Sequence, residues 1–134
     1  MPIVELDLGG ARTLLFAMRQ LLHATVEQDA DAFTLLDKLA VAFPGPIAEQ
    51  VAITRAQLGE RPENKQRQGI LRRLTDAWVR GGIVTMRYRA VDRQGARTLC
   101  FEPWVLEPSA TTGATYVVGY DHTKEVVGPF KLHR

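Results

Sequence analysis

The 134-residue sequence has a single cysteine, Cys100. This scarcity excludes an internal disulfide framework and a zinc site built from cysteines. Long apolar runs are also missing, since none approaches the ~20 residues that a membrane-spanning helix needs. The first ten residues, MPIVELDLGG, have neither the basic nor the apolar region of a signal peptide. From these absences we expect a cytoplasmic protein that has no membrane partner.

Patterns that carry chemistry are equally scarce. The three histidines have no metal-ligand spacing, the glycine pairs match no phosphate-binding loop, and the carboxylates occur singly. Cys100 lies between Leu99 and Phe101 in an apolar context that suits a core residue, and no oriented base is evident beside it. We therefore expect no metal, no cofactor and no catalytic activity.

Charge of one sign is not in excess overall, because 17 Lys and Arg side chains face 15 Asp and Glu side chains. The two halves of the chain nevertheless differ. Residues 1–60 carry four basic and eight acidic side chains, whereas residues 61–134 carry 13 basic and seven acidic ones. This asymmetry predicts either an anionic ligand for the second half or attraction between the halves.

Apolar residues at three-to-four spacing predict helices in the first 80 residues. Helices are expected at residues 11–28, 47–58 and 65–80. Another helix is expected to begin after Asp29 or Asp31, either of which suits the N-cap, and to end at about residue 42. Gly81-Gly82 follows the last helix and suits a left-handed stop. The apolar stripe of the first helix, which includes Leu14, Met18, Leu21 and Leu22, suits either the core of its own unit or contact with a partner chain.

From Ile83 the period changes to two, which predicts strands. They are expected at 83–89, 97–102, 104–107, 114–120 and 125–133, with a hairpin turn at 92–95 and breaks at Pro103 and Pro108. Five short strands with tight turns suit a small curled antiparallel barrel that removes its own edges by closure. We therefore expect an α+β chain in which a helical linker or dimerisation region, 1–64, precedes a barrel with its leading helix, 65–134.

Several short motifs in the second half follow one another in a specific order. They are Leu71-Arg72-Arg73-Leu74, Met86-Arg87-Tyr88-Arg89, Arg97 six residues before Pro103, Trp104-Val105-Leu106, Thr115-Tyr116-Val117-Val118-Gly119-Tyr120 and Phe130-Lys131-Leu132-His133-Arg134. Their spacing over residues 70–134 resembles the WYL domain, the sensor module of a large group of bacterial transcription regulators. Only Tyr116 of the name-giving Trp-Tyr-Leu tripeptide remains, and Gly128 stands where the family usually has Arg. The resemblance implies a five-stranded SH3/Sm-like barrel.

The resemblance also implies a function: the ligand-sensing module of a bacterial transcription regulator, which binds a nucleotide or a short single-stranded nucleic acid. The site residues that it implies are Tyr88, Arg97, Tyr116, Arg134 and Arg73. Arginine offers a planar fork for phosphate, and tyrosine offers a stacking face with a polar tip. The residues alone allow other roles. The tyrosines also suit the barrel core, Arg97 suits a salt bridge at the rim, and at most one of Arg72 and Arg73 faces the barrel.

Two other functions stay open: a direct binder of single-stranded RNA or DNA, and an oligomerisation domain without a ligand. Regulators that this chain resembles carry a winged helix-turn-helix head before the region seen here and usually an extension after it. Residues 1–10 are too few for such a head. We expect a homodimer that meets duplex DNA only through a DNA-binding domain outside this sequence, either as a piece of a longer regulator or as a natural protein without a head.

Overall fold

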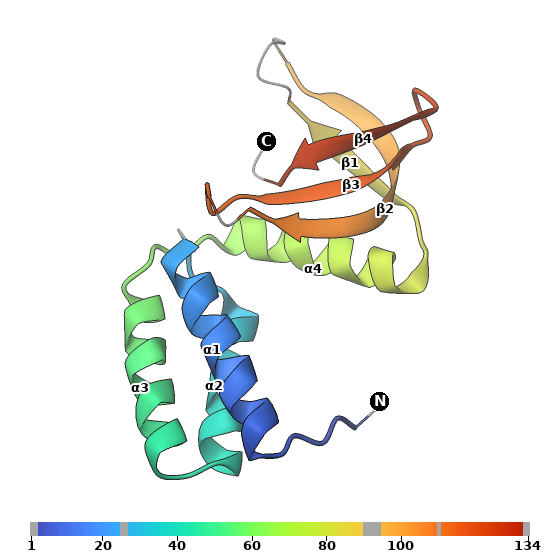
Figure 1. The fold of residues 1–134 in the computed structure, drawn as a ribbon. Helices are drawn as coiled ribbons and strands as arrows, with labels where there is room; N and C mark the ends of the chain where they lie inside the picture. The colour runs from blue at the N-terminus through green and yellow to red at the C-terminus, as the bar shows by residue number, and fades with distance from the viewer. Residues whose placement is uncertain (1–2, 25–26, 90–94, 110, 133–134) are drawn as a thin grey trace. The chain divides into compact units, whose positions relative to one another are not determined.

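The computed structural model describes residues 3–24, 27–89, 95–109 and 111–132. The chain divides into two units, Met1–Asn64 and Lys65–Arg134. The first unit contains three helices, and the second contains one helix and an antiparallel sheet (Figure 1). This is the α+β class expected from the sequence. No helix in the described ranges has the length and apolar character that crossing a membrane requires.

The first unit packs α1 (Leu8–Ala24), α2 (Ala30–Ala42) and α3 (Pro46–Gly59) around one apolar core. The buried core residues are Ala11, Leu15, Leu22, Leu36, Leu39, Val51 and Leu58. Leu14 and Met18 pack against this core, whereas Leu21 is exposed. Most of the α1 stripe therefore serves the core of its own unit.

Side-chain caps set the N-terminal ends of the first two helices. Asp29 caps α2 as predicted, since its carboxylate accepts hydrogen bonds from the backbone N–H groups of Asp31 and Ala32. The predicted bounds 11–28 for the first helix were wrong at both ends. It begins at Leu8 because Asp7 Oδ1 accepts a 2.7 Å hydrogen bond from the N–H of Gly10. It ends at Ala24, and the N–H of Gln28 donates to the carbonyl oxygen of Pro62 instead of continuing the helix.

The second unit begins with α4 (Lys65–Arg80), which has the bounds expected from the sequence. Gly81 ends the helix with a φ of 67°, and the N–H of Gly82 donates to the carbonyl oxygen of Ala77 at 2.8 Å. This is the left-handed glycine stop that the Gly-Gly pair predicted. The glycine pair leads directly into the sheet, so α4 is joined to the first strand without a long loop.

The sheet has four strands, β1 (Val84–Tyr88), β2 (Arg97–Pro108), β3 (Thr115–Asp121) and β4 (Val126–Lys131), in the order β1-β2-β3-β4. The prediction of a closed five-stranded barrel was therefore wrong: in the described residues β1 and β4 are the edges of an open sheet. The two strands expected on either side of Pro103 are one strand. Pro103 does not end β2 because the pairing register with β3 shifts between Pro103 and Val105, and a proline is tolerated at such a bulge.

The open sheet is strongly curled. The ring of Tyr88 in the edge strand β1 meets the ring of Phe130 in the other edge strand, β4, edge to face with centroids 4.7 Å apart. The concave inner face holds the core, which α4 covers on one side (Figure 1). The buried members of this core are Leu74, Leu99, Phe101, Val117 and Leu132. The predicted hairpin turn at 92–95 lies mostly outside the described residues.

Gly119 in β3 lies very close to the backbone of the paired strand β2. A Cβ atom at this position would overlap the carbonyl oxygen of Glu102 and lie 2.8 Å from a ring carbon of Phe101. No side chain fits there without moving the backbone of β2. The glycine thus permits the curl that brings the two edge strands together.

Candidate functional site

Two of the residues expected to bind a ligand lie directly opposite each other at one end of the sheet. Tyr88 pairs with Arg97 across β1 and β2, two positions beyond the pair of Met86 with Leu99. Since alternate residues share a face, both side chains lie on the concave inner face. Both also adjoin Phe130: the guanidinium carbon of Arg97 lies 6.0 Å from the centroid of that ring.

Arg97 is held by a buried carboxylate. Its Nη2 lies 2.8 Å from Oδ2 of Asp121, whose side chain is fully buried, while 29% of the Arg97 side chain is exposed. The other carboxylate oxygen, Oδ1, accepts hydrogen bonds from the backbone N–H groups of Thr123 at 2.9 Å and Lys124 at 3.3 Å. The carboxylate of Asp121 therefore has three donors, two of which belong to the loop between β3 and β4.

Electrostatics fixes the charge of this pair. Burial by itself would raise the pKa of Asp121, but the hydrogen bond from Arg97, those from the N–H groups of Lys124 and Thr123, and the positive charge of Arg97 together lower the pKa below its ordinary value. The carboxylate is therefore ionised at neutral pH and holds the guanidinium in one position. A guanidinium has five N–H donors, so the bond to Asp121 leaves capacity for an anion at the partly exposed rim.

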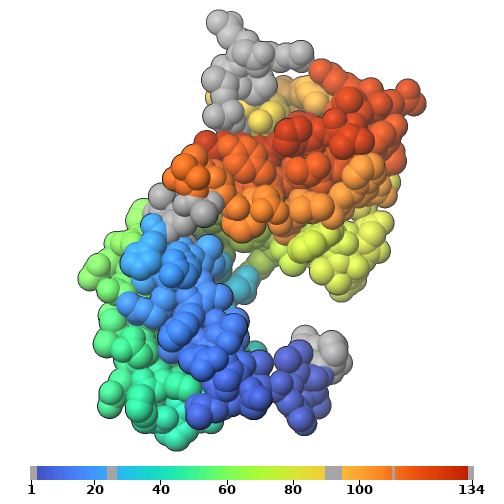
Figure 2. All heavy atoms as spheres, viewed as in Figure 1, coloured from blue at the N-terminus to red at the C-terminus, as the bar shows by residue number. Residues whose placement is uncertain are grey.

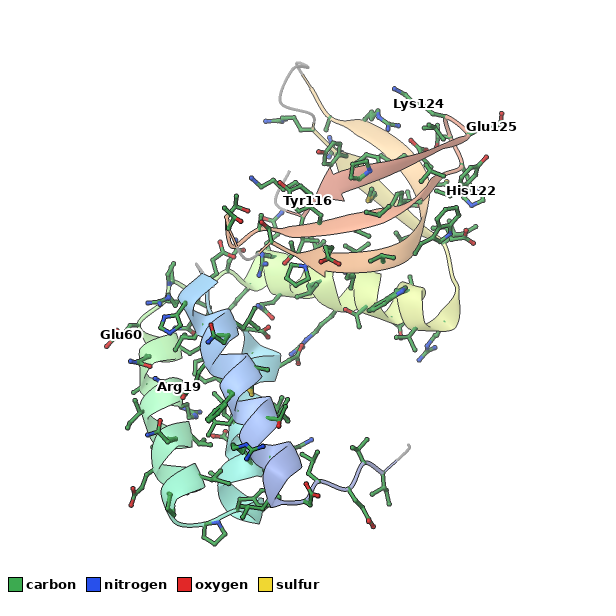
Figure 3. All side chains as sticks on the ribbon, in the orientation of Figure 1. Arg19, Glu60, Tyr116, His122, Lys124 and Glu125 are labelled. Carbon is green, nitrogen blue, oxygen red and sulfur yellow. The ribbon has the colours of Figure 1, made fainter. Side chains whose placement is uncertain are left out.

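Tyr116 is not brought to this site. In β3 the buried residues Val117 and Asp121 share the inner face, so Tyr116 lies on the outer face, where it is half-buried. Its direct partners across the strands are Lys131 in β4 and Glu107 in β2. In Figure 3 the labelled side chains of Tyr116 and His122 lie near opposite ends of β3.

The remaining expected site residues lie elsewhere. Arg73 is exposed on α4, as is Arg72, while the next residue, Leu74, is buried in the core. Arg134 and His133 lie outside the described residues. A different arginine of α4 contacts the sheet instead: Arg67 Nη2 donates a 3.0 Å hydrogen bond to Thr115 Oγ1.

Sequence reasoning missed Asp121, which it treated as one of several scattered carboxylates. A signal for its burial was present, because Asp121 lies four residues after the apolar Val117 and alternate residues of a strand share a face. A carboxylate on a buried face needs a partner of opposite charge.

In the described ranges no cluster of His, Cys, Asp and Glu is suited to hold a metal ion, and Cys100 is exposed rather than in the core.

Comparison with known families agrees with the motif pattern. Residues 69–134 match the family model described as the WYL domain. The C-terminal unit therefore belongs to the WYL domain family, and the resemblance seen in the sequence is confirmed.

No curated protein matches the sequence. Among solved structures, the chain is similar to proteasome accessory factor B/C (PafBC) of Arthrobacter aurescens, with 18% sequence identity and a TM-score of 0.48. The match covers 98% of this chain and 19% of that one, so the chain spans about a fifth of the length of that protein.

Proposed function

We propose that this chain is the ligand-sensing part of a bacterial transcription regulator and that its WYL domain binds a small anionic effector at the inner rim of the sheet. The effector class is a nucleotide or the end of a short single-stranded nucleic acid. One observation carries the proposal: the guanidinium of Arg97 is held by the buried, ionised Asp121 beside the rings of Tyr88 and Phe130. A donor fork that is already oriented loses little freedom when it binds phosphate.

The proposed role is binding without catalysis. An effector regulates only if it binds one arrangement of the protein better than another. Helix α4 is suited to transmit such a difference, because only Gly81-Gly82 and Ile83 separate it from β1 and because its Arg67 contacts Thr115 of β3. Such a regulator would act in the cytoplasm, where the bacterial chromosome lies.

The test is a fluorescence-anisotropy titration of the whole chain with an end-labelled single-stranded oligonucleotide, at low and near-physiological salt, with mononucleotides as competitors. Arg97→Lys keeps the charge but loses the fork, so it is expected to weaken binding about tenfold. Tyr88→Phe removes the hydroxyl and keeps the ring beside Phe130. The matched control is Arg87→Gln, which removes a positive charge from an exposed position on the other face of β1. Absence of saturable binding, or equal weakening by Arg87→Gln, would overturn the proposal.

A second candidate function rests on the outer face, where Tyr116 and Lys131 are direct cross-strand partners. A stacking ring next to a cation suits direct, sequence-tolerant binding of single-stranded RNA or DNA. This alternative predicts that affinity falls steeply with salt, because several phosphates are contacted. It also predicts that Tyr116→Ala weakens binding while Arg97→Lys does not. The opposite result supports the effector site on the inner face.

A further inference from the structure

The bulge in β2 turns two consecutive apolar side chains toward solvent. In a regular strand, neighbouring side chains point to opposite faces. Here the register shifts between Pro103 and Val105, and Trp104 and Val105 are 46% and 43% exposed, whereas Pro103 is buried. Bulges that re-aim side chains in this way are common beside functional sites.

Trp104 belongs to a row of rings on the convex outer face. It stacks on Tyr120 of β3 with ring centroids 6.2 Å apart and planes inclined by 16°. His122 meets the same tyrosine edge to face, with centroids 4.7 Å apart. Val127, the β4 partner of Tyr120, is 51% exposed and extends the apolar surface. The orange and red atoms of β3 and β4 form a continuous surface in Figure 2.

A carboxylate lies at the edge of these rings. The indole Nε1 of Trp104 donates a 2.7 Å hydrogen bond to Glu102 Oε2, and Glu102 is the direct cross-strand partner of Tyr120. This bond fixes the indole ring, and it leaves further acceptor capacity on the carboxylate. Within the described parts of the chain, no lysine or arginine forms an ion pair with Glu102, and none lies over the ring of Trp104 or Tyr120.

We propose that this aromatic and acidic surface is a second binding site, which takes an arginine side chain of a partner peptide. The faces of tryptophan and tyrosine attract cations, and a carboxylate matches the donor fork of a guanidinium. A phosphate would be repelled by Glu102, so the ligand chemistry is opposite to that of the inner rim. Apolar residues on either side of the arginine would contact Val105 and Val127. The site does not depend on the effector site, because its residues lie on the other face of the sheet.

The experiment is an NMR titration of the whole ¹⁵N-labelled chain with the capped peptide Ala-Val-Arg-Val-Ala. A second peptide carries citrulline, the neutral isostere of arginine, at the central position. We expect the arginine peptide to shift the indole N–H signal of Trp104 and the amide signals of Tyr120 and Val127. The citrulline peptide is expected to bind at least about tenfold more weakly, because it lacks the charge that the rings and the carboxylate recognise.

Matched variants locate the site. Glu102→Gln removes the charge while leaving an oxygen for the indole N–H, and it is expected to weaken binding of the arginine peptide about tenfold. Glu107→Gln removes a carboxylate from the same strand and face beside Tyr116, and it should change little. Trp104→Leu should abolish binding, whereas Trp78→Phe, which alters the exposed tryptophan of α4, should not. If Trp104→Leu does not fold, the comparison of Glu102→Gln with Glu107→Gln still tests whether the arginine peptide binds at this surface.

Three results would overturn the proposal. One is equal binding of the arginine and citrulline peptides. Another is equal weakening by Glu102→Gln and Glu107→Gln. The last is movement of the Trp104 indole signal by a mononucleotide but not by the arginine peptide, which would make the surface a nucleobase platform. None of these results bears on Arg97, so they are distinguishable from failure of the effector site.

Discussion

Arg97 and Asp121 form a 2.8 Å ion pair although they are not cross-strand partners: Asp121 pairs with Phe101, four residues further along β2. The arginine side chain therefore extends along β2 toward Phe101 and meets Asp121 at the end of β3. The same carboxylate accepts two N–H groups of the loop that follows. One buried charge therefore connects the end of the β1–β2 pair with the β3–β4 loop.

Removal of the arginine is expected to be costly. Arg97→Ala leaves the ionised carboxylate of Asp121 buried without its partner, and we expect it to lower the free energy of unfolding by about 3 kcal/mol. Urea denaturation measures the change. Arg87→Ala is the control, since its exposed side chain should cost no more than about 0.5 kcal/mol. Equal losses in the two variants would contradict a stabilising role for the pair.

The lowered pKa of Asp121 predicts an acid-sensitive contribution to stability. Because the folded-state pKa lies below the unfolded value of about 3.9, this contribution is fully present above that value and is lost as pH falls through the folded-state pKa. The stability difference between the natural chain and Asp121→Asn should stay constant from neutral pH to about 5 and shrink below about 4. Denaturant titrations across this range test it. A difference that persists unchanged into strong acid would show that ionisation of Asp121 is not the cause.

Gly119→Ala should be destabilising by about 3 kcal/mol or prevent folding, because the new methyl group would overlap the backbone of Glu102. The same substitution at Gly69 in α4 provides a control of opposite sign. A Cβ at Gly69 meets no atom within 4 Å. Alanine should therefore stabilise that helix by about 0.5–1 kcal/mol. Thermal unfolding of both variants tests the pair, and a neutral Gly119→Ala would mean that the backbone of Glu102 does not lie so close to Gly119.

Glu125, in the β3–β4 loop, has a φ of 54°, a left-handed conformation that is unfavourable for a residue with a side chain (Figure 3). Glu125→Gly should raise stability by about 1 kcal/mol, since glycine adopts this conformation without strain. Lys124→Gly in the same loop lacks this benefit and should lower stability by about 0.5 kcal/mol through added freedom of the unfolded chain. A calorimetric comparison in which both variants change stability in the same direction would refute the explanation.

Local signals predicted all four helices, although the local Asp7 cap that starts α1 was overlooked, and long-range contacts explain the misses in the sheet. The Asp29 cap and the Gly81 stop depend on neighbouring residues, so they can be read from the sequence. The bulge in β2 depends on β3, and Pro103 taken alone suggested a strand break. The types of the site residues were predictable, but their grouping was not. The residues alone did not show which alternate residues of β3 face the core. The structure places Tyr116 on the outer face and Arg97 on the inner face, which separates the two side chains.

The bulge also determines how β2 tolerates changes in length during evolution. Trp104 is the residue that has no partner in β3, because Pro103 pairs with Gly119 and Val105 with Val118. Its deletion would leave a regular ladder in which both halves of β2 keep their present faces. Deletion or insertion of one residue elsewhere in the strand would exchange core and solvent positions in one half. A related sequence that is one residue shorter here can therefore keep the same core while losing the outer aromatic surface.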